Sequence, residues 1–211
     1  LIYINNIYNN FFERMGKMKR KIFVFIGAPA SGKGTRINEC VGYKSISTSC
    51  ILKNAGYDLT KGTLISDEVV NELVIREMER LKESNIILDG FPRTENQFLV
   101  LLEYNIQICK VFYIKGPKDI LFERANDRLT CTKCQSSFTK SEFKRPKVKG
   151  ICDYCGGTLV ERVDDSRELF EKRIEVFEEK TKPVLKLFQK YHIPIVEIDA
   201  TLPPSEILKY I

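Results

Sequence analysis

The stretch that decides the fold is Ile22–Thr35, which reads IFVFIGAPASGKGT. A short apolar run, a glycine-rich turn and an expected helix start follow one another directly, which is the order of a phosphate-binding loop. The glycines let successive backbone N–H groups point at an anion, and Lys33 adds a full positive charge beside them. The stretch predicts a nucleotide phosphate site; a plain glycine-rich turn is the alternative.

The rest of the chain has the composition of an ordinary globular protein. It has 211 residues, of which 43% are hydrophobic and 29% charged, and its formal net charge is +6. This length suits one α/β domain with a small insertion. No apolar run approaches the about 20 residues of a membrane-spanning helix, so we expect no membrane partner. The positive charge favours anionic ligands without separating nucleotides from nucleic acids.

Short apolar runs alternate with amphipathic segments along the chain. We expect strands near 22–26, 44–47, 85–88, 108–114 and 193–198. We expect helices over 66–83, from Pro117 to about Leu129, after Asp164 with an interruption at Pro183, and from Pro204 to Ile211. This alternation predicts an α/β fold, with a parallel sheet covered by helices on both faces. Residues 48–65 and 130–163 do not fit the alternation and are interpreted as insertions on that core.

Four of the seven cysteines form two pairs, Cys131-x-x-Cys134 and Cys152-x-x-Cys155. Each pair brings two sulfurs to one side of a tight turn, and two such turns complete a tetrahedral site. Because thiolates fill all four positions, no ligand position stays open for a water. We therefore expect a structural Zn²⁺ rather than a catalytic one. Two disulfides, or four unrelated thiols, are the alternatives.

The segment around these cysteines is basic, with Lys133, Lys140, Lys144, Arg145, Lys147 and Lys149. A zinc ribbon with this charge also suggests nucleic-acid binding. Proteins that bind single strands, however, interleave aromatic side chains with the basic ones as stacking platforms, and aromatic residues are sparse here. We interpret the charge as a solvated surface and expect no nucleic-acid partner.

A second distinctive run is Leu88–Thr94, LDGFPRT, at the end of the third expected strand. Ligands bind at such strand ends in open parallel sheets. Asp89 is placed there to hold a magnesium-bound water; capping of a turn is the alternative. Arg124 and Arg128 are four residues apart and therefore share one helix face. Arg173 lies on the helix expected after Asp164.

These motifs, in this order, resemble the adenylate kinase family. The resemblance is carried by Gly27–Thr35, Asp89–Thr94, the four-cysteine segment, and Arg162-Val163-Asp164-Asp165 with Arg173. It implies a P-loop kinase domain over residues 21–211, with a five-stranded sheet in the order 2-3-1-4-5. It also implies a zinc-binding lid, residues 130–163, over the donor nucleotide and an acceptor flap, residues 48–65, over the acceptor.

The resemblance assigns roles to residues at matching positions. On the donor side it implies contacts to ATP from Gly27, Ala30, Ser31, Gly32, Lys33, Gly34, Thr35, Arg124 and Arg128. On the acceptor side it implies contacts to AMP from Thr48, Lys53, Ile65, Gly90, Arg93, Gln97, Arg162 and Arg173. The implied catalytic set is Lys33, Asp89, Arg93, Arg128, Arg162 and Arg173. Within these sets, Arg124 would pack on the donor base and Gln97 would read the acceptor base.

The acceptor flap departs from the family pattern. Ser49-Cys50 stand where the family has Gly-Asp, and Lys53 replaces an arginine, keeping the charge but losing the bidentate fork. The stretch from Lys53 to Gly62 is shorter by about ten residues, close to one average helix. In the phosphate loop, Ala30 replaces a glycine. We expect its φ to be negative, because a methyl group is tolerated there only in that case.

The expected activity is reversible, Mg²⁺-dependent phosphoryl transfer, ATP + AMP to 2 ADP, by a monomer. The acceptor phosphate oxygen is already anionic, so this reaction needs clustered positive charge and positioning rather than a general base. Another nucleoside monophosphate as acceptor, or GTP as donor, is the alternative within this class. A catalytically weak nucleotide sensor is the alternative from a different class.

Residues 1–20 mix Asn, Tyr and Ile and are expected to be an extension without a fold of its own. A transit peptide is the alternative, and it would direct the protein to the mitochondrion or another organelle. Cys40 and Cys109 lie in segments expected to be buried, where a free thiol is ordinary. Nothing in the sequence requires disulfides, so we expect a reducing compartment, the cytoplasm.

Overall fold

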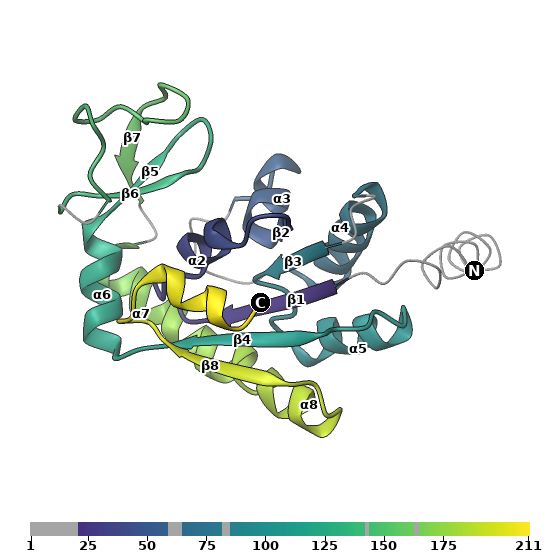
Figure 1. Ribbon diagram of the computed structural model, residues 1–211. Coiled ribbons are helices and arrows are strands. Elements are labelled where there is room, and N and C mark those ends of the chain that lie inside the picture. Colours follow the sequence, from purple (N-terminus) through teal and green to yellow (C-terminus); the bar gives the residue numbers. More distant parts are fainter. Residues whose placement is uncertain (1–20, 59–64, 82–84, 142–143, 163–164) are drawn as a thin grey trace.

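A computed structural model of the chain describes residues 21–58, 65–81, 85–141, 144–162 and 165–211. Its centre is a parallel sheet whose strands are β1 (Lys21–Gly27), β2 (Lys44–Ser47), β3 (Asn85–Asp89), β4 (Lys110–Lys115) and β8 (Ile195–Asp199). They lie in the order β2-β3-β1-β4-β8 (Figure 1). Since β8 is the fifth strand of this sheet, the predicted α/β class and the order 2-3-1-4-5 are confirmed.

Helices cover both faces of this sheet. They are α2 (Lys33–Glu39), α3 (Thr48–Asn54), α4 (Asp67–Arg80), α5 (Glu95–Glu103), α6 (Lys118–Asp127), α7 (Arg167–Val176) and α8 (Val184–Lys190), with a π-helical turn η3 (Phe177–Thr181) and a 3-10 segment η4 (Pro204–Lys209). Crossover connections between parallel strands are right-handed. The connection from β1 to β2 leads toward one edge of the sheet, whereas the later connections lead toward the other edge. Therefore α2, packed on η4, covers one face, while α4, α5 and α8 pack in series on the other.

The core explains why the strands are apolar runs. Both faces of β1 are covered, and its residues from Ile22 onward are buried. The register pairs Phe25 with Asp89 and Gly27 with Ile114, so the carboxyl ends of β1, β3 and β4 meet at one edge of the sheet. Gly27 has to be a glycine, because a Cβ there would lie 2.6 Å from the carbonyl oxygen of Ile114. This edge is where the two sequence motifs come together.

The cysteine-rich segment forms a second, smaller sheet. Its antiparallel strands β5 (Arg128–Cys131), β6 (Ser137–Thr139) and β7 (Leu159–Glu161) lie in the order β6-β5-β7, beyond the end of α6 (Figure 1). The helix expected to reach about Leu129 ends at Asp127, because the chain becomes extended at Arg128 to pair with β6. Cys131, Phe138, Cys152 and Leu159 form the small core of this sheet.

Other expectations from the sequence need smaller corrections. Cys40 is buried as expected, but Cys109 is exposed, because it precedes β4 instead of belonging to it. The helix expected over 66–83 is α4, which ends at Arg80, and residues 82–84 lie outside the described part. The long helix expected after Asp164 is divided into α7, η3 and α8, and the last segment is a 3-10 helix.

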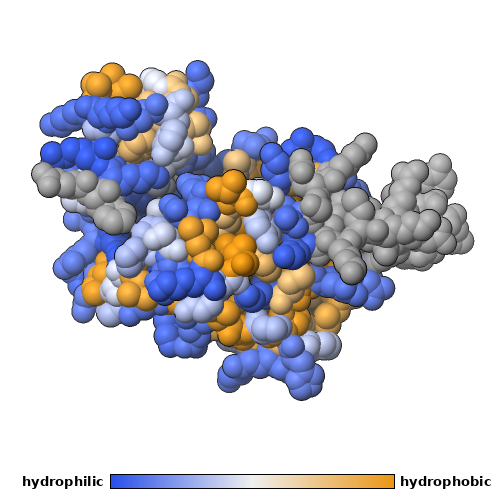
Figure 2. Space-filling view, in the orientation of Figure 1, coloured by the Kyte–Doolittle hydropathy of each residue, from blue (hydrophilic) through white to orange (hydrophobic). Residues whose placement is uncertain are grey.

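Some large hydrophobic side chains are exposed on the surface of the protein. The face shown in Figure 2 is largely hydrophilic, with hydrophobic residues gathered over the C-terminal segment. Leu202, Leu208 and Ile211 are among the exposed large hydrophobic side chains. Within the described ranges, no helix combines the length and apolar character that crossing a bilayer requires.

Candidate functional site

The phosphate loop connects β1 to α2 and folds around its own lysine. Lys33, the first residue of α2, donates from Nζ to the carbonyl oxygens of Gly27 at 2.5 Å and Ala28 at 3.1 Å, and lies 3.5 Å from Ser31 Oγ. The N–H of Ser31 closes the turn onto the Ala28 carbonyl at 3.2 Å. The ammonium group is thus held inside the concave side of the loop, where an anion would be received.

Two residues of this loop have left-handed backbone, Ala30 at φ 58° and Gly32 at φ 82°. The expectation of a negative φ at Ala30 was wrong: the loop takes its curvature even though a methyl group is present. Left-handed backbone costs an alanine about 1–2 kcal/mol. At Gly32 a side chain is excluded twice, by the φ angle and because a Cβ would lie 2.8 Å from Arg36 Nη1.

Substitution of Ala30 by glycine is expected to raise the free energy of unfolding by about 1 kcal/mol, because it relieves the left-handed alanine. Chemical denaturation measures this change. Ala55→Gly is the matched control, since Ala55 is exposed and has φ −83°, where glycine brings only a loss of stability. A destabilised Ala30→Gly protein would contradict the strain at Ala30.

Positive charge converges on the lysine from three other elements. Burial lowers the pKa of Lys33 from its ordinary value to about 8; Asp89 opposes this shift, and the guanidinium groups of Arg93, Arg173 and Arg128 add to it. These arginines come from the β3–α5 connection, α7 and β5. A site that holds four cations this close together, in excess of the carboxylates beside them, is suited to a multiply charged anion.

Two of the arginines share one carboxylate. Asp165, whose side chain is 5% exposed, accepts from Arg128 Nε at 2.9 Å and Nη2 at 2.6 Å, and from Arg173 Nη1 at 3.0 Å. Sequence reasoning quoted Asp165 in a motif but gave it no role. The two consecutive aspartates in Arg162-Val163-Asp164-Asp165 were the sequence signal that could have suggested a partner for the arginines. The shared carboxylate fixes both guanidinium groups where the cavity needs them.

The predicted acceptor side is anchored to the end of β3. Thr48 Oγ1 donates to the carbonyl oxygens of Gly90 at 3.0 Å and Asp89 at 3.3 Å, which fixes the start of α3. Arg93 Nε donates to the Gly90 carbonyl at 2.9 Å. At Gly90, with φ 75°, a Cβ would lie 2.6 Å from Arg93 Nη2, so the glycine leaves room for the guanidinium.

Gln97, the expected base-reading residue, is buried and engaged at both ends of its amide. Its Oε1 accepts from the N–H of Arg93 at 2.7 Å, and its Nε2 donates to Asp67 Oδ1 at 2.7 Å. Asp67 also accepts from Thr94 Oγ1 at 2.7 Å. This network joins the start of α4 to the start of α5, so the amide has a structural role besides the one expected from the sequence.

Lys53 lies on α3 and reaches the small sheet. Its Nζ donates to Gln135 Oε1 at 2.9 Å, a residue next to Cys134 with left-handed backbone at φ 61°. The bond is exposed and connects the acceptor flap to the lid. Nothing in the sequence placed these two segments side by side.

One cavity of about 740 Å³ joins these parts. Every nucleotide-contacting and catalytic residue expected from the sequence lines it: Gly27, Ala30, Ser31, Gly32, Lys33, Gly34, Thr35, Thr48, Lys53, Ile65, Asp89, Gly90, Arg93, Gln97, Arg124, Arg128, Arg162 and Arg173. Residues 200–204 also line it, and sequence reasoning missed them. Arg124 Nη1 donates to the Ala200 carbonyl at 2.8 Å and so holds this segment.

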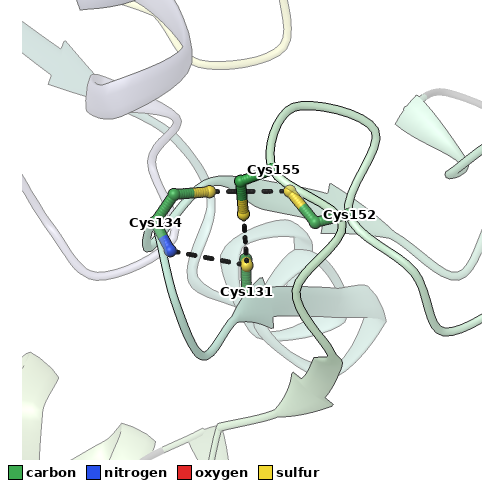
Figure 3. Close-up of side chains that lie close together, drawn as sticks. All are labelled: Cys131, Cys134, Cys152 and Cys155. Atoms are coloured by element: carbon green, nitrogen blue, oxygen red, sulfur yellow. Dashed lines mark hydrogen bonds between the residues drawn. The ribbon is translucent and has the colours of Figure 1, made fainter.

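The four paired cysteines meet at one point of the small sheet (Figure 3). Their sulfurs all lie within 4.8 Å of one another, with 3.5 Å between Cys131 and Cys155 and between Cys134 and Cys152. The N–H of Cys134, with that of Lys133, donates to Cys131 Sγ and lowers the pKa of that thiol. This donor set can hold one metal ion.

A phosphate loop at the end of the first strand of a 2-3-1-4-5 sheet, facing converging arginines across one cavity, defines the class of P-loop phosphotransferases. A family model described as adenylate kinase matches residues 25–193. The adenylate kinase of Pyrococcus horikoshii is 37% identical over 196 residues, which cover 84% of this chain and 87% of that protein. That of Thermococcus kodakarensis is 33% identical over 208 residues, covering 90% and 91%.

The chain belongs to the adenylate kinase family. The adenylate kinase of Clostridium tetani, 31% identical over 210 residues and covered to 95%, supports the same assignment. The predicted family and the predicted enzyme class, a nucleoside monophosphate kinase, are therefore confirmed.

Proposed function

We propose that this chain transfers the terminal phosphoryl group of Mg²⁺-bound ATP to AMP, reversibly, in the cavity described above. The observation that carries the proposal is the convergence of Arg93, Arg128 and Arg173 on Lys33 of the phosphate loop. Phosphoryl transfer needs neither a covalent intermediate nor a general base when the acceptor is a phosphate. It needs two phosphates in line, neutralised charge and exclusion of water.

The donor and the acceptor would enter from opposite sides of this charge cluster. The phosphate loop and Lys33 would hold the donor phosphates, with Arg124 near the donor base. Arg93, at the end of β3, would hold the acceptor phosphate. Arg128, Arg162 and Arg173 would neutralise the group in transit, and the pairing of two of them with Asp165 supports this role because it fixes their geometry.

Two metal ions complete the proposal. Mg²⁺ bound with ATP would neutralise charge between the phosphates, and the Thr35 hydroxyl and the Asp89 carboxylate are oxygen donors in the cavity wall that could hold it. Zn²⁺ fits the four cysteines. Four thiolates that each lie about 2.3 Å from one zinc ion are separated from one another by nearly the distance found between these sulfurs. With four protein ligands this zinc would be structural.

The domain division follows the same assignments. We assign residues 21–211 to one kinase domain, with the acceptor flap at 48–65 and the lid at 130–163; residues 59–64 and 1–20 lie outside the described part. None of the seven cysteines, all of which lie in the described ranges, forms a disulfide; this suits a reducing compartment, and we propose the cytoplasm.

A kinase assay across a panel of nucleotides tests the function. Purified protein is given ATP or GTP with AMP, CMP, UMP or GMP, and the diphosphate products are separated. ADP formation from ATP and AMP is expected to be the fastest reaction. Binding of ATP without diphosphate formation from any pair would overturn the kinase and favour the sensor. Faster transfer to another monophosphate would place the change in the acceptor flap, where Lys53 donates to Gln135.

The affinity for ATP is expected to fall as the pH rises from about 7 to 9.5. The Lys33 ammonium is protonated below its pKa of about 8, so its charge is present at neutral pH and lost above that value. Each pH unit above the pKa costs up to about tenfold in affinity. Titration calorimetry measures this, and Lys33→Ala is expected to give a flat profile. An unchanged wild-type affinity up to pH 9.5 would contradict the shifted pKa.

A further inference from the structure

Arg36 is a buried charged residue to which the sequence assigned no role. It lies on α2, is 2% exposed, and is among the largest fully enclosed side chains. Its Nη2 donates to the carbonyl oxygens of Leu202 at 2.7 Å, Asp199 at 3.1 Å and Ala200 at 3.1 Å. One guanidinium nitrogen therefore gathers three carbonyls from the segment that follows β8.

The other end of this guanidinium contacts the phosphate loop. Nη1 lies 3.4 Å from the Ser31 carbonyl oxygen, and it occupies the space that a Cβ on Gly32 would need. Arg36 thus touches two walls of the cavity that are far apart in sequence. Residues 31–35 form one wall, and residues 200–204 form the other.

Arg124 takes part in the same arrangement. Its Nη1 donates to the Ala200 carbonyl, which then accepts from two guanidinium groups at once. The Asp199 side chain lies near both cations, and its charge offsets part of their repulsion. If residues 199–202 moved, the carbonyl that holds Arg124 would move with them. The position of Arg124 therefore depends on Arg36.

The buried charge of Arg36 is costly, and an uncharged side chain of similar volume would fill the same space. Removing one partner from a buried charged group typically costs several kcal/mol, whereas replacing the whole group by an apolar side chain of similar volume is often neutral. What an apolar side chain cannot do is hold three carbonyls in one arrangement. A lysine ammonium could bond these carbonyls, but it has no second nitrogen to reach the Ser31 carbonyl at the same time, so it cannot join the two walls as the planar fork does.

We propose that Arg36 is a positioning residue that holds residues 199–202 against the phosphate loop and thereby sets where the nucleoside part of the donor is seated. The inference rests on the proposed function, in which the phosphate loop holds the donor phosphates. With the phosphates fixed at one wall, the base has to reach the other wall, formed by residues 200–204 and Arg124.

Arg36→Lys tests this proposal, because it keeps the charge and removes the fork. Titration calorimetry measures the affinity of the whole chain for ATP and for inorganic tripolyphosphate, which has phosphates and no nucleoside. We expect ATP to bind about tenfold more weakly and tripolyphosphate to bind within about twofold of wild type. Arg76→Lys is the matched control, since Arg76 is exposed on α4 and pairs with Glu72 at the surface.

Several results would overturn the proposal. An equal loss of affinity for ATP and tripolyphosphate would show that Arg36 acts on the phosphate loop, and an unchanged ATP affinity would show no positioning role. Thermal unfolding monitors the fold, and Arg36→Gln serves as a second variant. If neither variant folded, the carbonyl contacts would be a folding requirement alone. Because binding is measured without turnover, a wild-type protein that binds ATP but transfers no phosphate would refute the function and leave this test readable.

Discussion

Replacement of Lys33 by alanine is expected to lower the rate of phosphoryl transfer by about 10²–10³-fold, the usual cost of removing one preorganised donor to a developing charge. The Lys33 ammonium is held by the carbonyls of Gly27 and Ala28 inside the phosphate loop. In the reaction those contacts would be exchanged for phosphate oxygens. Initial rates in both directions, at saturating nucleotide, measure the loss.

A loss of activity in Lys33→Ala has to be separated from a loss of fold. Burial lowers the pKa of Lys33, which means that the folded state disfavours this charge. Removing the charge in Lys33→Ala is therefore not expected to lower the midpoint of thermal unfolding. Lys44→Ala is the control, because Lys44 is exposed at the start of β2 and lies away from the cavity. Rates within a few-fold of wild type in Lys33→Ala would refute the phosphate role.

Substitution of Cys152 by serine is expected to abolish stoichiometric zinc binding and to lower the midpoint of thermal unfolding by about 10 °C. In a chain of this size each kcal/mol lowers the midpoint by about 2–4 °C. The expected drop therefore corresponds to about 2.5–5 kcal/mol, a part of the about 10–16 kcal/mol with which zinc binds four-ligand peptides. Cys152 is buried in the small core of the lid, where the remaining three thiols cannot complete a tetrahedron.

Metal analysis and calorimetric unfolding measure the two effects in the same preparation. Cys109→Ser is the control, since Cys109 is an exposed thiol outside the cluster. A chelator should reproduce the drop in the wild-type protein and leave Cys152→Ser unchanged. Full zinc content in Cys152→Ser would disprove the site, and sensitivity to a thiol reductant instead of a chelator would indicate disulfides.

The parts of this fold that the sequence predicted are those decided by neighbouring residues. Strand β1, the glycine turn and the start of α2 are contiguous, and the apolar runs that mark β3 and β4 follow from burial on both faces. The cysteine spacing placed the metal cluster for the same reason.

The parts that sequence reasoning missed depend on partners far along the chain. The left-handed backbone of Ala30 is a property of the closed loop, and local preference pointed the other way. The three carbonyls that Arg36 Nη2 bonds lie more than 160 residues further along the chain, so no local pattern announces that Arg36 is buried. The short strands of the lid lack a clear alternation, and only their pairing around Cys131 makes them a sheet.

The contact between Lys53 and Gln135 joins the acceptor flap to the lid across the cavity, and its weakness affects how nucleotides enter and leave. The bond is exposed and runs from an ammonium to an uncharged amide, so it is worth no more than an exposed ion pair, about 1 kcal/mol at most. Breaking it shifts the balance between a shut and an open entrance by no more than about fivefold. This contact alone therefore holds the entrance shut only weakly. Nucleotides can then enter and leave without any other ligand having to release it.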